Sequence, residues 1–173
     1  MIFLLPKYTK TDLIIKQAQK EGIVLDTCVL SIFLTGIYEE KKKITGLLDK
    51  VGGTVEDFQI LKQLLPTFEN YLTPHVLAET QGILTKCFNN ETALDIIKEG
   101  LLYLLDMNEN QIEKDDILQK TELNEFGIID VSLLLCSEEH KKIILTLDHR
   151  LEEKSNCILS MRILRAYYYT NFQ

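Results

Sequence analysis

One aspartate interrupts the otherwise apolar run IVLDTCVL, which spans residues 23–30. The residues around Asp26 are the β-branched and aliphatic types that fill a strand buried on both faces. A lone carboxylate in such a position destabilises a fold by several kcal/mol unless something compensates it. Asp26 is therefore the first residue for which the sequence predicts a chemical role.

Three further acids stand where the chain can bring them to Asp26. Asp148 ends a second buried run, KKIILTLD, and parallel strands would release both carboxylates at the same edge of a sheet. Asp130 stands in the first turn of a largely apolar helix, one helix and one turn before that strand. Glu79 lies beside the apolar stripe of the helix predicted for HVLAETQGIL. Each acid alone also fits a helix cap, a turn or a solvated helix face, but the four together are more specific.

Four carboxylates at one edge predict a metal site. Crowded carboxylates repel one another and raise one another's pKa values unless a cation lies between them. Oxygen ligands select hard divalent ions, so we expect Mg²⁺ or Mn²⁺. Such a site suits phosphodiester hydrolysis, because metal ions activate water, neutralise the phosphate and stabilise the leaving oxygen.

The elements that must position these acids alternate along the chain. Buried runs at 23–27 and 143–147, and shorter ones at 70–74 and 156–160, alternate with amphipathic segments. This order predicts a parallel sheet covered on both faces, an α/β fold of the three-layer α/β/α sandwich type. The segment 101–107 fits either a continued helix or a separate strand.

Composition sets the broad class. The 173 residues are 46% hydrophobic and 26% charged, which is typical of a soluble globular protein and indicates one domain over residues 1–173. No apolar run is long enough to span a membrane and no signal peptide is recognisable, so we expect a cytoplasmic protein without membrane contact. The net charge of −7 argues against a broad basic face for nucleic acid. The four widely spaced cysteines are expected to be reduced core residues: Cys28, Cys87, Cys136 and Cys157.

The order of the motifs resembles the PIN-domain family, metal-dependent ribonucleases that include the VapC-type toxins of bacterial toxin–antitoxin pairs. The resemblance is carried by IVLDTCVL, LTPHVLAET, FGIIDVSLLL and IILTLDHRL, in that order. It implies a PIN-like sandwich in which residues 1–22 form an extra N-terminal helix. It also implies cleavage of RNA with Mg²⁺ or Mn²⁺, and an antitoxin protein as a partner. The metal-binding and catalytic quartet would be Asp26, Glu79, Asp130 and Asp148, with the hydroxyls of Thr27 and Thr146 near it.

Other functions remain open at this stage. The chain also fits an inactive PIN-like module that binds RNA or a protein partner without cutting, although a scaffold has no need of four acids. Haloacid-dehalogenase phosphatases are disfavoured, because the second acid that they need two residues after the first is Cys28 here. Candidate RNA contacts are Arg150, Arg162 and Arg165. The segment RILRAYYY, residues 162–169, also suits internal packing or a homodimer contact.

Overall fold

Five short strands form one all-parallel sheet in the order β3-β2-β1-β4-β5. The computed structural model describes residues 10–172 of the chain. The strands are β1 (Ile23–Leu25), β2 (Asn70–Leu72), β3 (Asn108–Glu109), β4 (Ile143–Thr146) and β5 (Ile158–Ser160).

The predicted pairing of the two most apolar runs is confirmed. β1 and β4 are parallel neighbours, with Ile23 opposite Ile143 and Leu25 opposite Leu145. The ladder continues past β1, because the Asp26 backbone N–H donates to the Leu145 carbonyl at 3.0 Å. The carboxyl ends of β1 and β4 therefore lie side by side at one edge of the sheet.

Helices make up most of the chain. They are α1 (Lys10–Glu21), α2 (Thr27–Lys42), α3 (Val55–Leu64), α4 (Pro74–Cys87), α5 (Asn90–Glu99), α6 (Leu101–Leu105), α7 (Lys114–Gln119), α8 (Ile128–His140), α9 (His149–Lys154) and α10 (Met161–Phe172). Short 3₁₀ turns lie at Leu48–Val51, Leu65–Thr67 and Thr121–Asn124. The helix predicted within residues 1–22 is α1, and residues 1–9 lie outside the described part of the chain.

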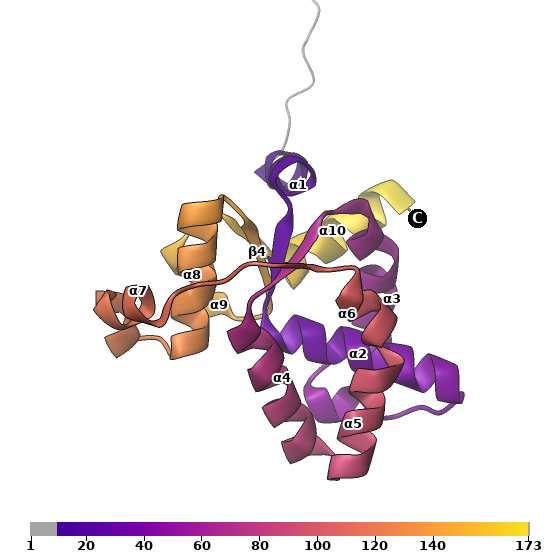
Figure 1. Cartoon of the computed structure of the whole chain (residues 1–173). Helices are drawn as coiled ribbons and strands as arrows, with labels where there is room; N and C mark the ends of the chain where they lie inside the picture. The colour runs from indigo at the N-terminus through magenta and orange to yellow at the C-terminus, as the bar shows by residue number, and fades with distance from the viewer. Residues whose placement is uncertain (1–9, 173) are drawn as a thin grey trace, which may run out of the picture.

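The helices cover both faces of the sheet, which gives the predicted three-layer α/β/α sandwich. α8 packs against β1 and β4, whereas α1 packs against β4 and β5 and contacts α10. α10 in turn packs against α3. Figure 1 shows α8 and α3 on opposite sides of the strands.

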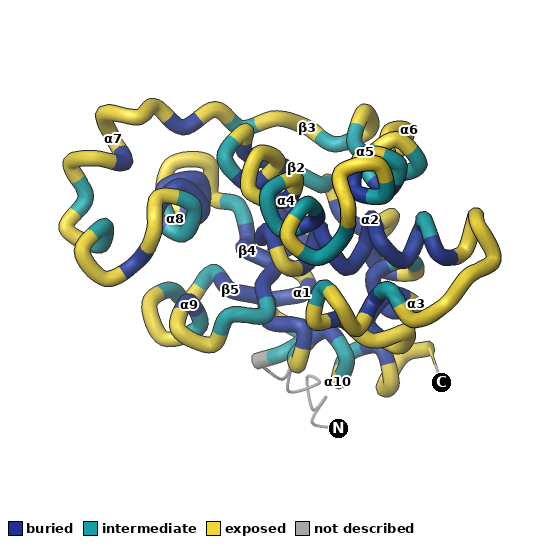
Figure 2. Tube along the Cα trace, turned by 90° about the horizontal axis from the view of Figure 1, so that it is seen from below, coloured by how far each residue is buried: buried dark blue, intermediate teal, exposed yellow. Residues whose placement is uncertain are grey.

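The buried apolar side chains form one cluster around the sheet and α2. α2 is buried along most of its length because α3, α4 and α5 all pack against it, and Figure 2 shows most of this helix, together with β4 and β5, in dark blue. Gly100 makes one of these approaches possible, since a Cβ there would stand 2.3 Å from Leu34 Cδ2. The segment left open at 101–107 is the short helix α6 followed by a turn, not a strand.

Among residues 10–172, no helix combines the length and the apolar character needed to cross a membrane.

Candidate active site

Asp26 lies at the carboxyl end of β1 and forms the N-cap of α2. The residue is only 5% exposed. Oδ1 accepts a hydrogen bond from the Thr27 backbone N–H at 2.6 Å, and Oδ2 accepts one from the Thr146 hydroxyl at 2.6 Å. Burial raises the pKa of Asp26 by more than these two hydrogen bonds lower it. Together with the charges of Asp130 and Glu79, burial raises the pKa to about 6.

The Thr146 hydroxyl joins Asp26 to Asp148. While it donates to Asp26, it accepts the Asp148 backbone N–H at 2.9 Å. Asp148 is the N-cap of α9, and its Oδ1 accepts the Arg150 backbone N–H at 2.8 Å. Thr146, at the end of β4, thus fixes the backbone of Asp148 and the carboxylate of Asp26.

Arg150 also reaches back to Asp148 with its side chain. Its Nε lies 3.1 Å and its Nη2 2.6 Å from Asp148 Oδ2. This contact and the positive charge of the guanidinium hold the pKa of Asp148 below its ordinary value.

Asp130 stands in the first turn of α8, as predicted, and its side chain is 21% exposed. Partial burial and the charge of Asp148 raise its pKa, although Arg150 acts in the opposite direction. Arg150 Nη2 is 3.9 Å from Asp130 Oδ2.

Glu79 reaches the site from α4. Its Oε2 accepts a hydrogen bond from the Thr27 hydroxyl at 2.8 Å, so one threonine holds Glu79 with its side chain and Asp26 with its backbone. Thr27 is buried, which makes this orientation of its hydroxyl a fixed part of the first turn of α2.

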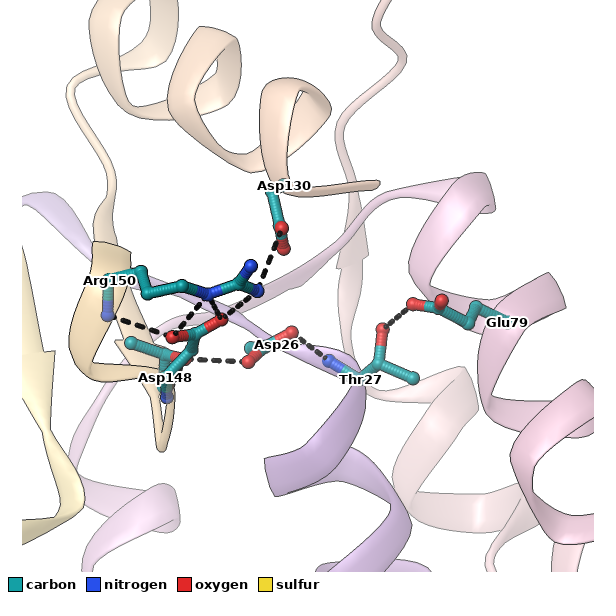
Figure 3. Close-up of polar contacts among 7 residues, drawn as sticks. Asp26, Thr27, Glu79, Asp130, Asp148 and Arg150 are labelled. Atoms are coloured by element: carbon teal, nitrogen blue, oxygen red, sulfur yellow. Dashed lines mark hydrogen bonds and ion pairs between the residues drawn. The ribbon is translucent and has the colours of Figure 1, made fainter. Parts of the chain in front are cut away.

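The four acids predicted from the sequence therefore lie around one edge of the sheet. Figure 3 shows Asp26 between Glu79 and Asp148, with Asp130 approaching from α8 and the Arg150 side chain between Asp130 and Asp148. Within residues 10–172, no group of three or more His, Cys, Asp or Glu side chains is arranged so that it could hold a metal ion. The donor set fits Mg²⁺ or Mn²⁺ in chemistry, because every donor is a carboxylate oxygen. In the present arrangement, a guanidinium takes the position of a cation beside two of these donors.

The prediction that Cys28 lies in the core is wrong. Cys28 is exposed, whereas Val29 and Leu30, the next residues of α2, are buried, because each residue of a helix is turned by about 100° from the one before it. Partial burial of the thiol and the surrounding acids, Asp26 first among them, raise its pKa to about 11. The thiol is therefore protonated and unsuited to act as a nucleophile. The other cysteines are free, with Cys136 buried and Cys87 and Cys157 partly so.

The three candidate RNA contacts differ in position. Arg150 lies at the site. Arg165 is paired with the buried Asp57, its Nε at 2.8 Å from Oδ1, and so links α10 to α3. Arg162 is exposed and lies 3.8 Å from Glu152 of α9, where both residues line a cavity of about 230 Å³ between α1, α9 and α10.

In comparisons with known proteins, no family model, no curated protein and no solved structure matches the chain.

Proposed function

We propose that the protein is a metal-dependent ribonuclease that hydrolyses phosphodiester bonds at the edge formed by Asp26, Glu79, Asp130 and Asp148. The observation that carries the proposal is Asp26, an almost fully buried carboxylate whose pKa is raised to about 6 with three other acids beside it. When Asp26 is ionised, its burial and the charges of the neighbouring acids destabilise the protein that has no metal ion bound. A bound cation would reverse that balance, since it stabilises the charged form.

Each residue has a distinct part in the proposal. Asp26, Asp130, Asp148 and Glu79 would hold Mg²⁺ or Mn²⁺, which would supply an activated water and charge neutralisation for the phosphate when bound. Thr146 keeps Asp26 in place through Oδ2, and Thr27 keeps Glu79 in place through Oε2. The two hydroxyls thereby fix the carboxylates before any ligand binds, which reduces the ordering needed on binding.

RNA as the substrate, and a role as the toxin of a toxin–antitoxin pair, rest on the resemblance of the four motifs to PIN-domain proteins. An antitoxin protein is the partner proposed on the same basis. A second copy of the chain is proposed from the segment RILRAYYY, residues 162–169, and a cytoplasmic location from the apolar runs of the sequence, which are too short to span a membrane. The alternative is a PIN-like module that binds RNA or a protein without cutting. The two functions differ in whether a divalent metal is needed.

The experiment that tests the function is cleavage of mixed RNA by the purified protein with Mg²⁺, with Mn²⁺, and with either metal plus chelator. We expect cleavage that the chelator abolishes, no cleavage of a matched DNA, and no cleavage of RNA by Asp130→Asn. Glu125→Gln is the control, because Glu125 is an exposed acid on the same approach to α8 whose carboxylate pairs with Lys154 at 2.7 Å. It should cut like the parent. Chelator-insensitive cleavage, or no cleavage of any RNA with either metal, would favour the binding module.

A further inference from the structure

Arg150 stands where the proposed function requires a metal ion. The same nitrogen, Nη2, lies 2.6 Å from Asp148 Oδ2 and 3.9 Å from Asp130 Oδ2. Nε adds a second contact to Asp148 at 3.1 Å, so the guanidinium meets this carboxylate with two of its nitrogens (Figure 3). A guanidinium and a hard divalent ion cannot both occupy the space beside these oxygens.

The Arg150 guanidinium lies beside an aromatic ring, but most of the Arg150 side chain is exposed to solvent. Its Cζ lies 5.9 Å from the ring centroid of Phe126, a buried residue shortly before α8, at the outer limit for attraction between a cation and an aromatic face. The Arg150 side chain is nevertheless 68% exposed. A long, exposed side chain held by an ion pair on a surface is displaced at little cost, because exposed ion pairs are weak.

We propose that Arg150 is a built-in counter-ion of the site, which occupies the space beside Asp130 and Asp148 in the metal-free protein, yields it to a divalent cation, and then binds a phosphate of the RNA. This inference rests on the proposed function and concerns the regulation of the same site. Arg150 lowers the repulsion among the acids when no metal is bound, and so competes with the metal. Once released, its planar fork matches a phosphate, with which guanidinium groups form paired hydrogen bonds.

The two halves of the proposal give effects of opposite sign for one substitution. Arg150→Gln keeps a polar side chain but shortens it and removes its charge. The variant should bind Mn²⁺ about tenfold more tightly than the parent, since a competing positive charge close to the metal has gone. The same variant, with Mn²⁺ bound, should bind RNA more weakly, since a phosphate contact has gone. A merely structural role for Arg150 would not move the two affinities in opposite directions.

The test measures Mn²⁺ binding by the electron paramagnetic resonance signal of free Mn²⁺, and RNA binding by fluorescence anisotropy of a labelled 2′-O-methyl oligoribonucleotide. Arg162→Gln is the matched control, because Arg162 is 74% exposed, similar to Arg150, and its loss changes the net charge equally. Its Mn²⁺ affinity should stay within about twofold of the parent's, since the ion pair of Arg162 is with Glu152 and not with a proposed metal ligand, and salt screens exposed charges. Arg150→Lys, which retains the charge, should bind Mn²⁺ with an affinity between those of the parent and the Gln variant.

The outcomes separate this inference from the proposed function. Tighter Mn²⁺ binding together with weaker RNA binding by Arg150→Gln, with the Mn²⁺ affinity of Arg162→Gln unchanged, supports the inference. Mn²⁺ binding by the parent that Arg150→Gln leaves unchanged or weakens overturns it, while the metal site itself stands. Tighter Mn²⁺ binding with unchanged RNA binding overturns the phosphate contact. If neither the parent nor Arg150→Gln binds Mn²⁺, the proposed metal site and the inference are both wrong.

Discussion

Replacing Asp26 by Asn should stabilise the metal-free protein while abolishing RNA cleavage. Asn keeps the shape of the side chain. Its Oδ1 can still accept the Thr27 backbone N–H, and its Nδ2 can donate to the Thr146 hydroxyl, which also accepts the Asp148 backbone N–H. The substitution therefore removes the buried charge, but the Thr146 hydroxyl proton loses the acceptor that Asp26 Oδ2 provides, which reduces the gain.

The size of the effect follows from the pKa of Asp26. A rise from the ordinary 3.8 to about 6 means that ionising the folded protein at this residue costs about 3 kcal/mol more than ionising the unfolded chain. Asn resembles the protonated acid closely but not fully. We therefore expect a gain of about 2 kcal/mol in unfolding free energy at pH 7.5, or about 4–8 °C in melting temperature.

The gain should depend on pH in a defined direction. Because the folded protein holds a proton on Asp26 more tightly than the unfolded chain does, the parent loses stability as pH rises from about 4 to about 6. Parent and variant should be nearly equal in stability near pH 4 and differ by the full amount above pH 7. Urea denaturation in the presence of chelator at both pH values measures the difference in unfolding free energy between parent and variant. The other titrating groups are common to both proteins and do not contribute to this difference.

Asp57→Asn is the matched control. Asp57 is also buried, at 1% exposure, but its Oδ1 accepts from Arg165 and its Oδ2 from Thr54. Removing this charge leaves a partly exposed guanidinium unpaired, so we expect the unfolding free energy to fall by roughly 1–3 kcal/mol.

Added Mn²⁺ should raise the melting temperature of the parent more than that of Asp26→Asn. An Asp26→Asn variant that is less stable than the parent at both pH values would refute the reasoning and make Asp26 a structural acid.

Thr146→Val removes a hydroxyl that donates to Asp26 and accepts a backbone N–H, and should lower the unfolding free energy by about 1–2 kcal/mol in urea denaturation; unchanged stability would show that this link contributes nothing. The Cys28 thiol, with a pKa of about 11, should react with iodoacetamide along a pH profile centred near that value, and peptide mass spectrometry showing a midpoint near 9 would contradict the partial burial of the thiol among the acids. Gly36→Ala places a Cβ 2.1 Å from Phe58 Cδ2, so thermal denaturation should reveal a loss of about 2 kcal/mol despite the better helix propensity of alanine, and a stabilised variant would disprove the close packing of α2 on α3.

The sequence was sufficient for the parts of the fold that depend on uninterrupted burial. The apolar runs ending at Asp26 and Asp148 predict two strands covered on both faces, and parallel pairing then predicts that both acids leave the same edge. β3 could not be predicted in this way, because Asn108–Glu109 is short, polar and exposed, with no alternation of apolar residues. Its pairing with β2 depends on tertiary contacts alone.

The details of the site were less accessible to sequence reasoning. Cys28 was assigned to the core from its apolar neighbours in the sequence, but a helix turns each successive residue by about 100° and the neighbours face the core instead. Arg150 was identified only as a candidate RNA contact. Its pairing with Asp148 depends on the N-cap conformation at the start of α9, which a two-residue spacing does not determine.

Three of the four acids also begin helices. Asp26 and Asp148 are N-caps, and Asp130 lies in the first turn of α8, so each has a role that survives without any chemistry. In a chain that had lost its activity, Asn or Ser would serve at 26 and 148 equally well, and without the unfavourable charge at 26. Glu79 has no such second role, because it lies in the middle of α4. Substitution of Glu79, together with loss of the charge at 26, would therefore indicate an inactive relative more clearly than a substitution at 130 or 148. Because Asp26 and Asp148 are N-caps, alanine is a poor choice for an inactive variant at either position: it removes a helix cap along with the carboxylate.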